Sequence, residues 1–133
     1  MRCALPLVLA ALALAACSGP AAPEDPGVCF RVDTAAGKST NTVVARGVEN
    51  LETCAVLLEG VNLQGHAAPT GAYQGYFIFI GADAMTSALH AGGVRYPIFQ
   101  PPQRRAIDRD IRRLMAERGG KMPDPGDFRL EHQ

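Results

Sequence analysis

The four cysteines, Cys3, Cys17, Cys29 and Cys54, have the widest choice of chemistry in this sequence. A thiol forms a disulfide, ligates a metal or accepts a covalent group, and spacing favours one of these over the others. No two of the four form a Cys-x-x-Cys pair and no histidine stands at ligand spacing from them. The sequence therefore predicts no metal site.

The first 17 residues have the layout of a secretory signal peptide. Arg2 supplies a positive charge, residues 4–13 form a short apolar run, and two small residues stand directly before Cys17. The run is too short to span a bilayer, and small residues let an extended chain enter a protease site.

The ending Leu14-Ala15-Ala16-Cys17 resembles the bacterial lipoprotein signal. This resemblance covers the first 17 residues and implies that residues 1–16 are removed. It also implies a diacylglycerol on the Cys17 thiol and a fatty acyl chain such as palmitate on its new amine. Two or three acyl chains would hold the protein in the membrane almost permanently, at about 0.8 kcal/mol per buried methylene. The alternatives are an ordinary cleaved signal with Cys17 left free and an uncleaved apolar anchor.

In the same family the residue after the lipidated Cys helps to sort the protein between membranes, with Asp favouring the inner one. Here that residue is Ser18. The resemblance therefore implies the outer membrane of a Gram-negative cell, with the domain in the periplasm.

Cys29 and Cys54 are the thiols that remain after such processing. Two leftover cysteines in an exported domain most simply form one disulfide. It would close a loop of 26 residues and contribute about 3.5 kcal/mol in the chain-entropy model. The competing interpretation, half of a metal site, has no Cys-x-x-Cys or histidine spacing to support it.

Other side chains capable of catalysis are scattered. His66, His90 and His132 fall in an expected loop, turn and tail, and no nucleophile elbow, phosphate-binding loop or dinucleotide fingerprint is present. Asp83 and His90 flank one expected hairpin and could face each other, but a solvated turn explains them as well. The sequence predicts no catalytic residue and no cofactor.

Length and charge limit the class of protein. Without residues 1–16, 117 residues remain, which fits one small domain with a tether. Lys and Arg number 13, as do Asp and Glu, and the lack of a basic excess argues against a nucleic-acid partner. Residues 17–27, rich in proline, are expected to be a tether that holds the domain roughly 30 Å off the lipid. Residues 28–120 are expected to be the domain and 121–133 a flexible tail.

The first half of the domain predicts a strand, a loop and a helix. Apolar residues alternate over 28–32, as in a strand, and 33–42 are polar, as in a loop. Val43-Val44-Ala45 then indicates a second strand or an extended lead-in. Asn50 is typical of a helix N-cap, and either Gly60 or Gly65 ends this helix. Its apolar stripe consists of Leu51, Cys54, Ala55 and Leu58.

The second half predicts mostly strands and a last helix. The stretch 73–80 ends in five uninterrupted aromatic or β-branched residues, which indicates a central strand buried on both faces. Residues 85–89 fit a strand or a helical turn equally. Pro97 cannot donate to a ladder, so 94–99 should be an edge strand. A helix should start at Pro101, with a stripe of Ile107, Ile111, Leu114 and Met115.

That last helix carries the one charge signal of the chain. Residues 103–118 hold six arginines against three acidic residues, a net of +3. One interpretation is a solvated face held by ion pairs along the helix, and the other is a docking face for anionic lipid or an acidic partner. The first is favoured because exposed charge runs are common. The candidate contacts of the second are Arg104, Arg105, Arg109, Arg112 and Arg113.

A second resemblance covers roughly residues 29–99 and concerns the fold alone. The chain is similar there to a group of short uncharacterised bacterial proteins, which implies a shared fold and no activity. The residues that carry it are Asn50-Leu51-Glu52-Thr53-Cys54-Ala55, Leu58-Glu59, Gly71-Ala72-Tyr73-Gln74-Gly75 and Phe77.

These observations predict an α+β domain, with a small, mostly antiparallel sheet packed by one helix and followed by an amphipathic C-terminal helix. The preferred function is a lipid-anchored, non-catalytic envelope protein that binds or supports another envelope component. The alternative is a small envelope hydrolase or ligand-binding enzyme that uses loop residues such as His66 or Asp83.

Overall fold

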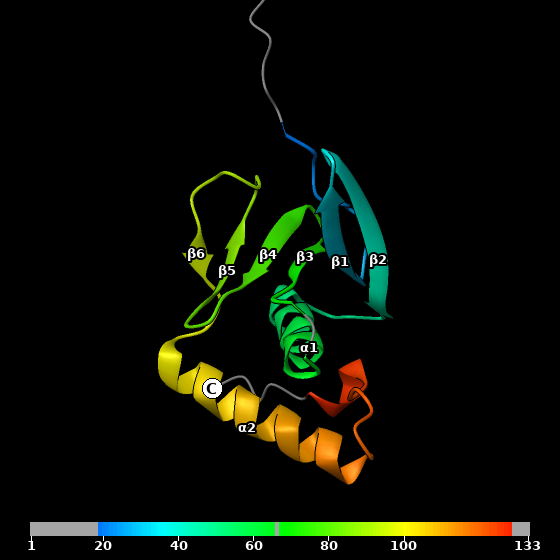
Figure 1. Cartoon of the computed structure of the whole chain (residues 1–133), viewed down its shortest axis with the longest axis vertical. Helices are drawn as coiled ribbons and strands as arrows, with labels where there is room; N and C mark the ends of the chain where they lie inside the picture. Colours follow the sequence, from blue (N-terminus) through cyan, green and yellow to red (C-terminus); the bar gives the residue numbers. More distant parts are fainter. Residues whose placement is uncertain (1–18, 66, 129–133) are drawn as a thin grey trace, which may run out of the picture.

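The computed structural model describes residues 19–65 and 67–128 and has the predicted α+β fold. Its antiparallel sheet has six strands in the order β2-β1-β3-β4-β5-β6, with one helix packed on it and a second helix beyond (Figure 1). The elements are β1 (Val28–Ala35), β2 (Lys38–Arg46), α1 (Leu51–Leu63), β3 (Thr70–Tyr73), β4 (Tyr76–Ile80), β5 (Met85–Ala88), β6 (Tyr96–Pro97), α2 (Pro101–Glu117) and a short 3-10 helix, η1 (Pro125–Asp127).

β1 and β2 form a hairpin, so the predicted loop over 33–42 is wrong. Ala36 and Gly37 turn the chain with φ angles of 52° and 75°, and two such residues in succession match the twist of a tight hairpin. β2 is mostly exposed, and no other described strand pairs with its outer edge. Its residues 38–42 are exposed on both faces and need no alternation of apolar residues, which is why this part of the sequence resembles a loop.

α1 begins as predicted. The Asn50 side chain accepts a hydrogen bond from the Thr53 backbone N–H at 2.8 Å. The helix runs through Gly60, and Gly65, with φ of 88°, follows its C-terminal cap. Eight consecutive residues, 53–60, are buried. The helix is therefore covered on more than one side, where the sequence predicted a single stripe.

The predicted disulfide between Cys29 of β1 and Cys54 of α1 is present. The two Cα atoms lie 5.4 Å apart and both residues are fully buried. The helix also approaches β3 closely at Gly71, where a Cβ would overlap the Leu58 side chain and lie 2.9 Å from the Phe30 carbonyl oxygen. The bridge and this glycine together fix α1 against the sheet.

β4 is the central strand that the sequence predicts. Ile78 belongs to the main core, the buried cluster between the sheet and α1. Phe77 belongs to a second buried cluster, on the opposite face of the sheet. The predicted stretch 73–80 is nevertheless two strands, because Gln74 and Gly75 turn the chain with φ angles of 43° and 85°. β5 is a strand rather than a helical turn. β6 lies at the sheet edge, as Pro97 predicts, but has only two residues.

α2 also follows the prediction. Pro101 and Pro102 occupy its first turn, and the Gln100 N–H donates to the Gln103 side chain at 2.8 Å. Gly119 and Gly120 end the helix with positive φ angles, and the Gly120 N–H donates to the Met115 carbonyl at 2.7 Å.

The segment after α2 packs on the domain over 121–128, where the sequence predicted a flexible tail. Met122 and Phe128 lie against the main core. An Arg118 nitrogen lies 2.6 Å from an Asp127 carboxylate oxygen. Residues 129–133 lie outside the described part of the chain.

Part of the predicted tether also packs on the domain. Ala22 is buried in the second cluster, the Gly75 N–H donates to the Pro23 carbonyl at 2.9 Å, and the Gly27 N–H donates to the Gln74 side chain at 2.9 Å. Only residues 18–21 separate Cys17 from the first packed residue, so a 30 Å spacer is wrong. Cys17 and the rest of 1–18 lie outside the described residues.

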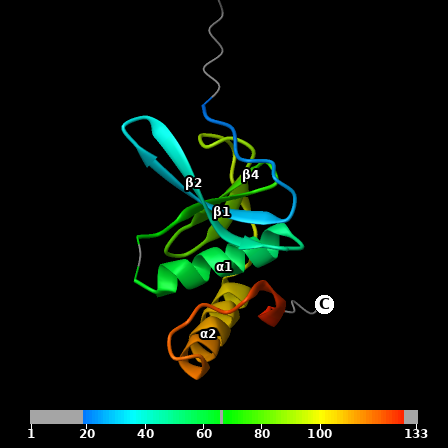
Figure 2. The same cartoon turned by 90° about the vertical axis from the view of Figure 1, so that its right-hand side faces the viewer.

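The elements stack in layers (Figure 2). α1 lies between the sheet and α2, and the N-terminal segment from residue 19 crosses the opposite face of the sheet. The main core therefore lies between the sheet and the helices. The second cluster lies beneath the N-terminal segment and is formed by Ala22, Val28, Phe30, Val32, Ala72 and Phe77, with Phe79 beside it.

Candidate functional site

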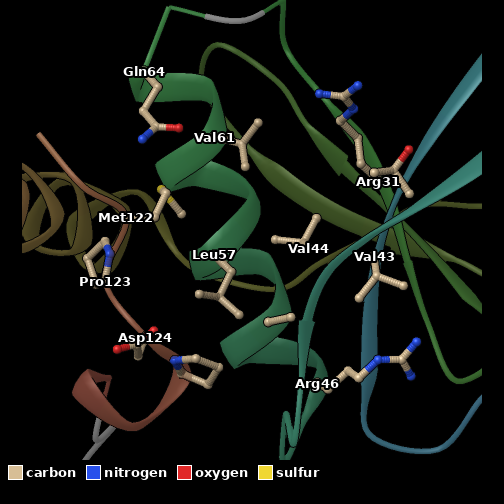
Figure 3. A pocket seen from close by; sticks show the side chains of 13 residues that line it. Arg31, Val43, Val44, Arg46, Leu57, Val61, Gln64, Met122, Pro123 and Asp124 are labelled. Carbon is tan, nitrogen blue, oxygen red and sulfur yellow. The ribbon is translucent and has the colours of Figure 1, made fainter.

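A groove of about 520 Å³ runs between β2, the outer side of α1 and the segment 122–125 (Figure 3). Two of its walls, β2 and the segment 122–125, include residues for which the sequence predicted a loop and a flexible tail. It is lined by Arg31, Thr42, Val43, Val44, Ala45, Arg46, Leu57, Val61, Gln64, Met122, Pro123, Asp124 and Pro125.

The floor of the groove is apolar. Leu57 and Val61 come from α1, Val44 projects from β2, and Met122 closes the opposite side (Figure 3). Met122 reaches this position because residue 60 is glycine: a Cβ there would lie 2.5 Å from the Met122 methyl carbon. The position of the Met122 side chain therefore depends on the absence of a side chain at residue 60.

The rim of the groove is charged unequally. Arg31 and Arg46 stand on the strand side, and Asp124 stands on the C-terminal segment. The Arg31 Nε donates to Asp33 at 2.9 Å, and Asp124 lies 3.5 Å from Arg118. Arg46 is exposed and has no ion pair among the described residues. The strand side thus offers an exposed cation above an apolar floor.

β2, the strand at the end of the sheet, contributes residues 42–46 to the groove lining. Its pairing with β1 shifts between Cys29 and Phe30, whose partners are Ala45 and Val43, so Val44 is an extra residue in the ladder. Such a bulge bends the strand and turns side chains that would otherwise alternate. This explains why five successive residues, 42–46, all line the groove.

The chemistry of the groove favours binding over catalysis. Its described lining offers one hydroxyl, on Thr42, and one carboxylate, on Asp124, with no histidine or cysteine beside them. A nucleophile needs a base within hydrogen-bond reach. Within residues 19–65 and 67–128, no group of three His, Cys, Asp or Glu side chains is placed to hold a metal ion.

Arg104 is buried, so its assignment to an anionic surface is wrong. Its Nη2 donates to Glu59 of α1 at 3.0 Å and its Nη1 donates to the Gly81 carbonyl at 2.7 Å, while Nε lies 3.9 Å from Asp108. Burial raises the pKa of Glu59, and the charge of Arg104 opposes that rise. The ion pair joins α1, α2 and the β4–β5 turn. The signal was available, because Arg104 stands three residues before Ile107 on the buried stripe.

The other predicted surface arginines are exposed on α2 and lie outside the groove lining. They are Arg105, Arg109, Arg112 and Arg113. Of these, Arg113 lies 3.2 Å from Asp110 along the helix.

The loop residues named for a hydrolase are not brought together. Asp83 and His90 are both exposed and stand at opposite ends of β5, so they do not face each other. His66 and His132 lie outside the described residues.

Sequence reasoning missed the groove because its walls are distant in sequence. Val43-Val44-Ala45 is an apolar run directly before Arg46 on an exposed strand, and that run was the available signal. Nothing in the sequence indicates that Met122 returns to α1, because a single Met after two glycines has no periodicity to follow.

No family model, curated protein or solved structure matches this chain. Among the described residues, no helix combines the length and the apolar character needed to cross a membrane.

Proposed function

We propose that this chain is a lipoprotein of the bacterial envelope, anchored through acyl chains on Cys17. Its domain faces the periplasm and acts without catalysis, by binding another envelope component. The Leu14-Ala15-Ala16-Cys17 ending supports the anchor, and Ser18 supports the outer membrane. The buried bridge between Cys29 and Cys54 suits an oxidising compartment.

The groove beside β2 is the binding site in this proposal, and it is the observation that carries the function. Its volume of about 520 Å³ is in the usual range for ligand sites, roughly 300–1,000 Å³. The outer edge of β2, with which no described strand pairs, offers backbone donors and acceptors, which extended peptides use when they add a strand to a sheet. Arg46 adds charge selection. The expected ligand is an extended segment of a partner protein with apolar side chains and a carboxylate.

Photo-crosslinking in intact cells tests this function. A photoreactive amino acid at Val43, which lines the groove and is 40% exposed, should form one dominant adduct with a protein. The matched position is Ala116, exposed on α2 and outside the groove lining, where that adduct should be missing.

A charge reversal provides the second arm. Arg46→Glu should reduce the adduct at position 43 several-fold, because the rim would then repel a carboxylate. Arg105→Glu, the same change on α2, should leave it unaltered. Equal adducts at 43 and 116, or an adduct that ignores Arg46, would contradict binding in the groove.

A further inference from the structure

The β5–β6 loop, residues 89–95, carries apolar side chains into solvent. Leu89 is 58% exposed and Val94 is 71% exposed, and Tyr96, the first residue of β6, is 63% exposed. From Leu89 to Tyr96 the chain has no acidic side chain and one cation, Arg95. A run of this kind, with aliphatic residues beside a tyrosine and an arginine, has the composition of protein segments that lie at a membrane interface.

The loop lies on the same side of the molecule as the N-terminal segment. Ala22 packs in the second cluster, and Phe79 lies beside that cluster. The Arg95 guanidinium carbon stands 3.7 Å from the centre of the Phe79 ring. Figures 1 and 2 both place this loop close to the segment from residue 19, whereas α2 lies at the opposite end.

The tether is short enough to bring this side to the lipid. Residues 18–21 lie between Cys17 and the buried Ala22. Five residue steps, fully extended, span at most about 18 Å. Several ångströms of that span lie within one headgroup layer. The two headgroup layers of a bilayer together add about 10–15 Å to a hydrocarbon core of about 30 Å. An anchored domain therefore keeps the side with the loop near the bilayer.

We propose that the β5–β6 loop inserts Leu89 and Val94 into the interface of the membrane that holds the Cys17 acyl chains. Tyr96 and Arg95 lie at headgroup level in this arrangement. The loop then fixes the orientation of the domain, and α2 with its arginines points away from that membrane. This inference rests on the proposed lipid anchor.

The experiment uses the full lipidated chain in vesicles of phosphatidylethanolamine with a minor share of phosphatidylglycerol. A Val94→Cys variant carries a polarity-sensitive fluorophore. The label has one target, because Cys29 and Cys54 are bridged and, in the proposed mature chain, Cys17 is acylated and Cys3 is removed. An Ala116→Cys variant on α2 is the matched control.

The label at position 94 should shift to shorter wavelength and be quenched several-fold more slowly by an aqueous quencher than the label at 116. A Leu89→Asp substitution should restore much of the quenching at 94. Equal quenching at both positions, or protection at 116 instead, would overturn the inference. So would protection at 94 that appears in native envelopes but not in pure vesicles, because a protein would then be the partner.

Mass spectrometry of the mature N-terminus distinguishes the two proposals. An unmodified Cys17 overturns both the anchor and the loop insertion. An acylated Cys17 with a fully quenched label at 94 overturns the loop insertion alone.

Discussion

At the scale of single residues, Glu59 and Arg104 combine high burial with opposite charge. Their side chains are 1% and 8% exposed and their charged atoms are 3.0 Å apart. A buried pair of this kind adds little over an apolar pair, because both charges lose their water. Removal of one partner, in contrast, leaves the other charge buried without compensation.

We expect Arg104→Met to lower the free energy of unfolding by about 3 kcal/mol, the range observed when one partner of a buried pair is removed. The double variant Glu59→Leu/Arg104→Met should recover most of this loss. Urea unfolding of the native, single and double variants, with the disulfide intact, gives the comparison. A single substitution as mild as the double one would contradict an energetic coupling between the two side chains.

The loss of stability caused by Arg104→Met should also depend on pH. Burial raises the pKa of Glu59, and Arg104 opposes that rise, so Arg104→Met should raise the pKa further. A carboxyl group whose pKa is higher in the folded state than in the unfolded state stabilises the fold fully at a pH below its unfolded pKa, about 4.3. This stabilisation is lost as the pH rises through the pKa of the folded state. The destabilisation should therefore be smallest in acid and grow with pH. The double variant has no Glu59 to titrate, so a similar growth there would refute this cause.

At the scale of elements, Gly60 and Met122 connect α1 to the segment that closes the groove. Alanine is more favourable than glycine in a helix interior by about 1 kcal/mol. A Cβ at position 60, however, would lie 2.5 Å from the Met122 methyl carbon and 2.8 Å from its sulfur. The benefit should therefore depend on whether Met122 is present.

Gly60→Ala should stabilise a Met122→Ala background by about 1 kcal/mol and should stabilise the native background by clearly less. Chemical unfolding of the four proteins of this double-mutant cycle measures the coupling. If the gain is the same in both backgrounds, Met122 does not occupy the position beside Gly60, and the C-terminal wall of the groove is wrong.

The elements also indicate what a sequence can predict. α1, β4 and α2 were predicted correctly because an N-cap, a continuous apolar run and a pair of prolines are local signals. The part of β2 up to Thr42 was mistaken for a loop because its strand state comes from pairing with β1, and its exposed side chains leave no alternation. The packing of Met122 and of the segment 22–27 was missed for the same reason, since it comes from contacts with residues that are distant in sequence.

At the scale of the whole molecule, the proposed lipid anchor, the short tether and the layered fold place the groove and the β5–β6 loop relative to a membrane. The second cluster beneath the N-terminal segment lies toward the tether, and α1 and α2 lie on the other side of the sheet. The groove lies on the α1 side of the sheet, between β2 and the C-terminal segment. It would therefore open away from the anchoring lipid, where a partner segment in the periplasm has access.

The anchor itself is tested by Cys17→Ala. In the native protein two or three acyl chains should hold the domain in the membrane fraction, at about 0.8 kcal/mol per buried methylene. Cys17→Ala should release a folded domain from membranes or stop processing, and the Cys29–Cys54 bridge should still form. Cys3→Ala is the matched control, because Cys3 lies in the part expected to be removed, and it should leave the anchor intact. A mature N-terminus that begins at any residue other than an acylated Cys17 would refute the lipoprotein assignment.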